Sequence, residues 1–256
     1  MKAIVVILIG LLFFQLIEKT KRVPSAVYNW NDMKVWRDGS QENRQIFQGS
    51  TTHMSYLDIQ AVTLDAKKMY DSKTARNDDE KLILVSGGEV KITMEKGEKL
   101  IGKGGIALMI PNEEYQLENA GDTSALFYVM NFRSKAAMSV DRGISEGGSL
   151  VISRNESAYN THDKGGRWNY FDRPTASCTD FEMHATSLNT GVNSHAPHTH
   201  VQEEIILMLQ GNAIMHIDGQ DYKSSEGDVI FLDSEVPHGL TNSGSEPCEY
   251  FAFQWK

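Results

Sequence analysis

The sequence has few cysteines and no long segment with helical periodicity after its first residues. Only Cys178 and Cys248 occur in 256 residues. Two thiols this far apart in the chain do not make the framework of a small disulfide-stabilised protein, so the fold must depend on a hydrophobic core. Two buried free thiols are favoured over a bridge. The composition, with 40% hydrophobic and 23% charged residues, is that of a globular protein of one or two domains.

Positive charge is also scarce. The chain has 25 Lys and Arg against 34 Asp and Glu, a formal net charge of -9, and no basic run dense enough for a nucleic-acid surface. The acidic surface argues against binding to anionic membranes. A Gly-x-Ser-x-Gly elbow and a Gly-rich phosphate loop are both absent from the sequence, so hydrolase and nucleotide-binding motifs of these kinds have no support. We expect a small-molecule ligand or substrate and no nucleic acid.

A long apolar run occurs at the N-terminus. Residues 3–17 are apolar except for Gly10 and Gln15, and the charged residues 18–22 follow. This length fits the hydrophobic part of a secretory signal and is shorter than the roughly 20 residues that span a bilayer. We predict that residues 1–26 are a cleaved signal peptide, or alternatively an uncleaved membrane anchor that tethers the chain through residues 3–17. The mature chain is expected in the periplasm, secreted, or anchored facing outside.

The remainder of the chain has the pattern of β-strands in two similar copies. Short alternating or apolar runs are separated by Gly, Asn, Asp and Ser clusters, as in an antiparallel sandwich or barrel. Residues 57–65 align with residues 181–189. The same offset places Glu80 on Glu204 and Gly87 on Gly211; after a shift of one residue it places Gly104 on Gly227, Asn119 on Asn242 and Gly121 on Gly244. This favours two copies of a unit of about 110 residues.

We therefore predict an all-β protein with two tandem barrels. The N-terminal barrel is assigned to residues 27–134, of which residues 27–43 form an extended arm. Residues 135–166, rich in Ser, Gly, Asn and charge, are expected to connect the barrels. The C-terminal barrel is assigned to residues 167–256.

A cluster of potential metal ligands lies in the second copy. The run from His198 to Glu204 contains His-x-His followed by a carboxylate, and Pro237-His238 follows later. If residues 198–208 form a strand, then His198, His200 and Glu204 share one face because side chains alternate with period two. With His238 from a neighbouring strand, they form a chelating set for one divalent transition metal.

The spacing of these residues resembles the two motifs of the cupins. Residues 191–211 match Gly, His-x-His, Glu and Gly, with six residues in place of five before His198. The second motif fits Gly227, His238 and Asn242, although Asp233 and Glu235 stand where Pro and Gly are usual. The chain is thus similar to two-domain cupins, or bicupins. The resemblance implies two double-stranded β-helix (jelly-roll) barrels, and a homodimer would cover exposed sheet edges.

The first copy departs from the motif. In the alignment above, Thr74 and Arg76 replace the two histidines, Glu80 is kept, and Tyr115 replaces the third histidine. We expect an ion pair between Arg76 and Glu80 and no metal in this barrel. Its role would be structural or to shape a pocket, although Arg76 could instead receive an anionic group.

Three neutral imidazoles and one carboxylate leave two positions open on a six-coordinate metal, and Mn, Fe, Ni, Co and Zn all tolerate these ligands. The favoured function is an exported enzyme of dioxygenase, decarboxylase or hydrolase type, acting on a small polar molecule with a carboxylate or hydroxyl. The alternative is a periplasmic protein that binds a small ligand or metal without turnover. His184 is the candidate acid–base residue, or else a packed histidine. His195 is expected at the rim. Glu203 should point to the opposite face, in solvent or as an acceptor behind the ligands.

Overall fold

The computed structural model describes residues 21–71 and 78–256. In this part of the chain the strands are β1 (Ala26–Tyr28), β2 (Lys34–Asp38), β3 (Gln41–Gly49), β4 (Met54–Leu64), β5 (Glu80–Gly87), β6 (Glu89–Met94), β7 (Gly97–Gly102), β8 (Ile106–Met109), β9 (Tyr115–Asn119), β10 (Ala125–Ser134), β11 (Leu150–Ile152), β12 (Tyr159–His162), β13 (Gly165–Asp172), β14 (Phe181–Leu188), β15 (Glu203–Gln210), β16 (Asn212–Ile217), β17 (Gln220–Ser225), β18 (Val229–Leu232), β19 (His238–Asn242) and β20 (Cys248–Trp255). The helical elements are α1 (Val140–Ser145) and two 3-10 turns, η1 (Trp30–Asp32) and η2 (Arg154–Glu156).

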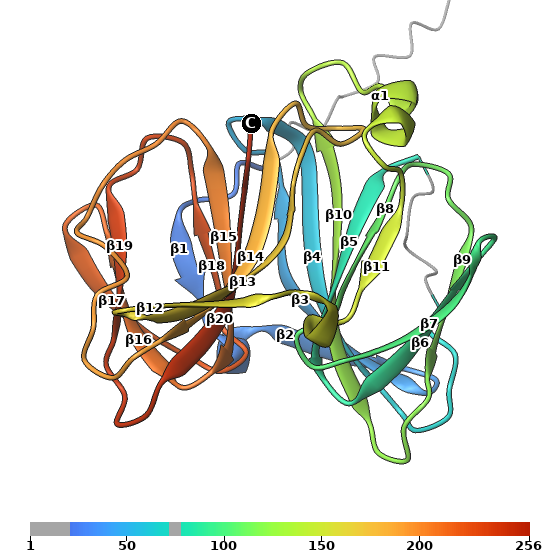
Figure 1. Ribbon diagram of the computed structural model, residues 1–256, viewed down its shortest axis with the longest axis horizontal. Helices are drawn as coiled ribbons and strands as arrows, with labels where there is room; N and C mark the ends of the chain where they lie inside the picture. Colours follow the sequence, from blue (N-terminus) through green and yellow to red (C-terminus); the bar gives the residue numbers. More distant parts are fainter. Residues whose placement is uncertain (1–20, 72–77) are drawn as a thin grey trace, which may run out of the picture.

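The strands form two β-sandwiches that lie side by side (Figure 1). Each pairs one seven-stranded sheet with one three-stranded sheet. The N-terminal barrel has the orders β11-β8-β5-β10-β4-β3-β2 and β7-β6-β9; the C-terminal barrel has β1-β18-β15-β20-β14-β13-β12 and β17-β16-β19. The predicted all-β class with two tandem barrels is confirmed.

Strand pairing corrects the alignment between the two copies. Phe132 of β10 pairs with both Leu57 and Glu80, and Trp255 of β20 pairs in the same way with Phe181 and Glu203. Glu80 therefore corresponds to Glu203, and not to Glu204 as we predicted. The one-residue shift falls before β5, and such a shift moves every side chain of a strand to the other face.

The position equivalent to Glu204 is thus occupied by Lys81. The glycines support the same register. Gly88 and Gly211 both have positive φ, at 73° and 81°, and a Cβ on either would lie within 3 Å of the first residue of the neighbouring strand, Ala125 of β10 and Cys248 of β20 respectively. Gly211 is therefore the counterpart of Gly88 and not of Gly87.

The two barrels exchange one strand each. β1 pairs with β18 of the C-terminal barrel, and β11 pairs with β8 of the N-terminal barrel. In Figure 1 the blue β1 lies in the orange half, and the yellow β11 lies in the green half. The expected arm at residues 27–43 therefore begins in the opposite barrel. The expected connection at residues 135–166 supplies β11 to one barrel and β12 to the other.

Side chains of the large sheets alternate between two environments. On β5 and β15, Leu82 and Ile205 face a cluster that contains residues of both barrels, whereas Ile83 and Ile206 face the interiors of their own barrels. The largest core therefore lies between the two seven-stranded sheets. Cys178 is buried in this shared cluster and Cys248 in the C-terminal barrel, and both are free thiols as expected.

Two expectations fall outside the described residues. Residues 1–20 of the predicted leader are not described, and neither are Thr74 and Arg76, so the predicted ion pair with Glu80 stays a prediction. Within residues 21–71 and 78–256, no helix has the length and apolar character needed to cross a bilayer.

Candidate metal centre

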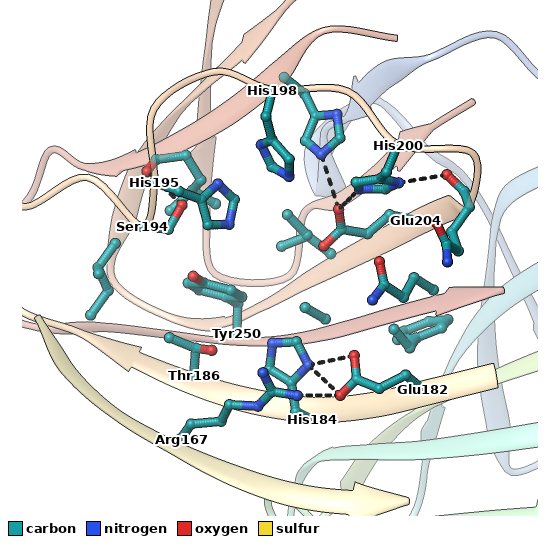
Figure 2. Close-up of a pocket in the computed structure, with 18 of the residues that line it drawn as sticks. Arg167, Glu182, His184, Thr186, Ser194, His195, His198, His200, Glu204 and Tyr250 are labelled. Carbon is teal, nitrogen blue, oxygen red and sulfur yellow. Dashed lines mark hydrogen bonds and ion pairs between the residues drawn. The ribbon is translucent and has the colours of Figure 1, made fainter. Parts of the chain in front are cut away.

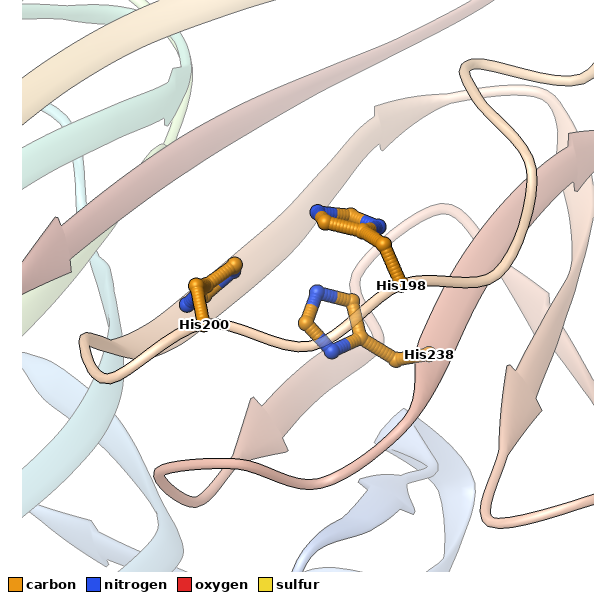
Figure 3. Close-up of side chains that lie close together, drawn as sticks. All are labelled: His198, His200 and His238. Atoms are coloured by element: carbon orange, nitrogen blue, oxygen red, sulfur yellow. The ribbon is translucent and has the colours of Figure 1, made fainter.

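The three predicted histidines converge at the mouth of the C-terminal barrel. Ring nitrogens of His198, His200 and His238 all lie within 4.8 Å of one another (Figure 3). The main chains of His198 and His238 exchange two hydrogen bonds of 3.0 Å, which hold the loop before β15 against the start of β19. The convergence that the spacing predicted is therefore present in the structure.

The local backbone differs from the prediction. We expected one strand over residues 198–208, but β15 begins at Glu203. Residues 199–202 lie outside any strand, with a bend at Val201 and Gln202. The main chain of His200 is held by the loop before β19, since Glu235 N donates to His200 O at 2.8 Å. His200 and Glu204 thus reach the same site across a bend and not along a regular strand.

Glu204 lies against two of the three imidazoles. Its Oε2 is 3.2 Å from Nε2 of His238 and 3.5 Å from Nε2 of His200. Burial alone would raise the pKa of Glu204, but the hydrogen bonds and charges of His200 and His238 outweigh it and lower the pKa to about 2. The carboxylate is therefore ionised and acts as an acceptor only.

The tautomers of two histidines follow from their backbone contacts. Nδ1 of His200 is 2.8 Å from the carbonyl oxygen of Gln202, and Nδ1 of His238 is 2.7 Å from that of Val236. A carbonyl only accepts, so each Nδ1 carries a proton, and in the neutral ring each Nε2 then presents a lone pair. These are the free nitrogens that point toward Glu204.

This arrangement fits a metal ion. Nε2 of His238 is buried and has no hydrogen-bond partner of good geometry, although a carboxylate oxygen lies nearby. Two acceptors this close repel each other unless a proton or a cation lies between them. A divalent cation would satisfy the imidazoles and the carboxylate together. Burial and the charges of His238 and His200 lower the pKa of His198, which favours its neutral, metal-binding form, whereas the hydrogen bond to Glu204 raises the pKa of His200.

The site opens into a pocket of about 590 Å³. One wall is built from alternate residues of three neighbouring strands: Glu182, His184 and Thr186 of β14, Tyr250, Ala252 and Gln254 of β20, and Glu204 and Ile206 of β15. Glu182, Gln254 and Glu204 lie in one row across these strands. Glu182 is therefore two strand spacings, about 10 Å, from Glu204.

His184 occupies this wall in a defined orientation (Figure 2). Its Nδ1 lies 2.9 and 3.0 Å from the two carboxylate oxygens of Glu182, which also contacts the guanidinium of Arg167. Nδ1 is therefore the donor, and Nε2 is left with a lone pair. An imidazole fixed by a carboxylate in a pocket is the arrangement of a general base.

His195 and Glu203, the two other residues considered from the sequence, lie on different sides of the sheet wall. His195 lies on the pocket lining with its ring centroid 4.3 Å from that of His198, but it is not among the mutually close nitrogens. Glu203 faces away from the pocket as predicted, but it is fully buried and not in solvent. Sequence reasoning missed Glu182; its place two residues before His184 on the same strand face could have revealed the pair.

The N-terminal barrel offers no equivalent among the described residues. Lys81 occupies the position of Glu204, and Tyr115 that of His238, with its buried hydroxyl lacking a hydrogen-bond partner. In residues 21–71 and 78–256, no second set of three or more His, Cys, Asp or Glu ligand atoms lies within 4.8 Å of one another.

The C-terminal barrel, which holds this site, matches a known protein family. A family model described as Cupin domain matches residues 186–253. An oxalate-binding protein of Thermotoga maritima is 38% identical over 56 residues, which cover 22% of this chain and 46% of that protein. The chain thus matches less than half of the length of its curated relatives.

Solved structures resemble most of the chain. An oxalate decarboxylase of Lactobacillus farciminis, in complex with formate, superposes with a TM-score of 0.70 at 12% identity, over 91% of this chain and 87% of that chain. AerE from Microcystis aeruginosa gives a TM-score of 0.68 at 15% identity, over 88% and 97% respectively. At these identities the similarity shows the two-barrel fold alone.

Proposed function

We propose that this chain, a two-barrel member of the cupin superfamily, binds one divalent transition metal in its C-terminal barrel and acts there on a small molecule that carries a carboxylate. The observation that carries the proposal is the convergence of His198, His200, His238 and Glu204, with Nε2 of two histidines directed at one carboxylate. Mn, Fe, Ni, Co and Zn all suit this donor set. We also propose export through residues 1–26, which N-terminal sequencing of the mature chain tests.

The chain's own residues would divide the work in the pocket. A bound metal would supply Lewis acidity and open positions for a carboxylate or carbonyl oxygen. Glu182 holds His184 as the Nδ1–H tautomer, so Nε2 of His184 can accept a proton from substrate or water and return it later. The barrel wall of Ile206 and Ala252 would exclude bulk water from the reacting atoms.

Oxalate is the first candidate to test. One relative is named for binding oxalate and one structural neighbour for decarboxylating it. The pocket lining holds Lys164 and Arg167 but also Asp172, Glu182 and Glu204, so the positive charge that favours an anionic ligand would come from the bound metal. A dioxygenase or a hydrolase that acts on a related carboxylate would use the same site. Measuring oxygen consumption and identifying the product distinguishes these reactions from decarboxylation.

Purified chain from metal-replete cells is expected to contain close to one transition metal ion per chain, because one complete donor set is described. Elemental analysis measures this. Tyr115→Phe changes the residue that occupies the position of His238 in the N-terminal barrel, and should leave the metal content unchanged. Absence of metal from the wild-type chain, or its loss in Tyr115→Phe, would contradict the proposed site.

Replacing His184 by Gln is expected to lower turnover of the substrate by about 100-fold or more while leaving metal content unchanged, since a general base contributes on this scale. His162→Gln is the matched control, because His162 also lines the pocket but its Nδ1 accepts a hydrogen bond from the main-chain N of Lys164 in place of donating to a carboxylate. Equal losses of turnover in both variants would contradict the assignment of His184 as the general base.

The alternative function is binding without turnover, and it is favoured by the relative that is named for oxalate binding. In that case calorimetry detects oxalate binding to the metal-loaded chain, but no product forms with any of the five metals. His184→Gln would then change affinity only. The two functions are therefore separated by one set of measurements on the wild-type chain.

A further inference from the structure

The segment that joins the candidate ligands is not held by a sheet. His200 and Glu204 flank a bend at residues 201–202, and β15 begins only at Glu203. A bend has no ladder of hydrogen bonds to fix the separation of the two side chains. A metal site needs that separation held closely, because misplaced ligands lose affinity. Other contacts must therefore position this segment.

Besides the bond from Glu235 N to His200 O, several of those contacts come from the N-terminal barrel. Residues 51–53, which we call the clamp loop, lie against the bend. Thr51 Oγ1 donates to Glu203 Oε2 at 2.7 Å, and His53 N donates to Glu203 Oε1 at 3.1 Å. Nε2 of His53 is 2.9 Å from the carbonyl oxygen of Val201. Trp255 of the C-terminal barrel completes the set, with Nε1 donating to Glu203 Oε2 at 2.9 Å.

The clamp loop is itself fixed. Thr51 Oγ1 accepts from Met54 N at 2.9 Å, so the single hydroxyl proton is directed to Glu203. Lys135 binds the loop on its other side, since its N donates to His53 O at 2.7 Å and its Nζ donates to Thr51 O at 2.6 Å. Thr51 and Glu203 are both buried, so water cannot easily replace their contact.

Glu203 and Glu204 are neighbours on opposite faces of β15. One carboxylate enters the contact between the barrels and the next enters the metal site. We infer that the clamp loop of the N-terminal barrel positions the metal ligands of the C-terminal barrel through Glu203 and Val201. Thr51 and His53 are positioning residues in this inference, which rests on the proposed metal binding.

The pseudo-symmetry of the chain provides an internal control. Residues 175–177 hold Glu80 as the clamp loop holds Glu203. Thr175 Oγ1 donates to Glu80 Oε2 at 2.8 Å, Ser177 N donates to the same oxygen at 2.8 Å, and Ala176 N donates to Oε1 at 3.2 Å. The residue that follows Glu80 is Lys81, which is no metal ligand. The same type of contact therefore occurs once beside a metal site and once without one.

The test is a titration of the metal-free full-length chain with Co²⁺, followed by visible absorption and calorimetry. Thr51→Val removes the donor and keeps the shape of the side chain, and it should weaken Co²⁺ binding about 10-fold or more and alter the ligand-field spectrum. Thr51→Ser keeps the hydroxyl and should restore both. Thr51→Val and Thr175→Val should reduce thermal stability to a similar extent, because each removes one buried hydrogen bond to a carboxylate. Thr175→Val should nevertheless leave the Co²⁺ affinity and the spectrum unchanged.

Each outcome bears on one claim. If Thr51→Val leaves Co²⁺ binding unchanged, or if Thr175→Val weakens it equally, the positioning role is wrong while the metal site stands. If the wild-type chain does not bind Co²⁺, the proposed function fails and the inference fails with it. Should Thr51→Val not fold, His53→Ala gives the same readout, because it removes only the ring contact with Val201 and keeps the main-chain donor.

Discussion

Replacing His198 and His200 together by alanine is expected to abolish metal binding. Two of the four donors are lost, and Glu204 is left beside His238 alone. Loss of a residue that only supports a ligand already costs about 10- to 100-fold in metal affinity, so loss of two ligands should cost at least about 100-fold. Elemental analysis of the purified variant and titration with Co²⁺ measure the effect.

The matched control for this variant is His162→Ala with His216→Ala. It also removes two histidines, but neither belongs to the group of mutually close nitrogens. This control should keep close to one metal per chain. A His198→Ala, His200→Ala variant that keeps its metal and folds normally would show that the ion is bound elsewhere, and the proposed function would then have no site.

Phe181→Ala is expected to lower the free energy of unfolding by about 3–5 kcal/mol. Phe181 is fully buried in the cluster between the barrels. Its ring centroid lies 5.6 Å from that of Phe132 in the N-terminal barrel and 6.0 Å from that of Trp255 in the C-terminal barrel. Truncation leaves a cavity that both sheets line, and denaturant unfolding followed by fluorescence and circular dichroism measures its cost.

The same experiment tests whether the shared cluster makes the chain cooperative. We expect one unfolding transition in the wild-type chain and in Phe181→Ala, because residues of both barrels pack into one cluster. Tyr222→Ala is the control, since Tyr222 is 42% exposed and its truncation should change stability by about 0.5 kcal/mol or less. Two separate transitions, or a loss below about 1 kcal/mol in Phe181→Ala, would contradict the shared core.

The sequence predicted the fold class because each strand is short, alternating and bounded by turn residues, and because the pattern recurs in two copies. It did not place the one-residue shift correctly. Glu80 and Glu204 are both acidic and precede apolar runs, so the alignment favoured a pairing that strand register excludes. Only partner strands reveal which of two adjacent positions faces the interior.

The exchanged strands could not be predicted from local pattern either. β1 and β11 have three residues each, and their partners are distant in the chain. A strand this short carries no periodicity that tells which sheet edge it joins. The same limit explains why residues 27–43 were expected as an arm of the N-terminal barrel, and residues 135–166 only as a connection between the barrels.

The candidate site was predicted more completely than its surroundings. His-x-His and Glu204 at motif spacing indicated side chains that lie close together in the structure, even though residues 199–202 are not a strand. Alternation also gave the correct face for Glu203. On that face Glu203 is contacted by the clamp loop, which lies about 150 residues earlier in the chain. Contacts across such separation are set by packing and leave no local signature.

The reciprocal exchange of β1 and β11 has a consequence for dissecting the protein. Cutting the chain between the barrels would take β1 away from β18 and β11 away from β8, and each fragment would expose an unpaired edge prone to aggregation. The arrangement is that of a domain-swapped dimer whose two subunits have been joined covalently. Its assembly is therefore intramolecular, and dilution cannot separate the halves as it would separate two free subunits.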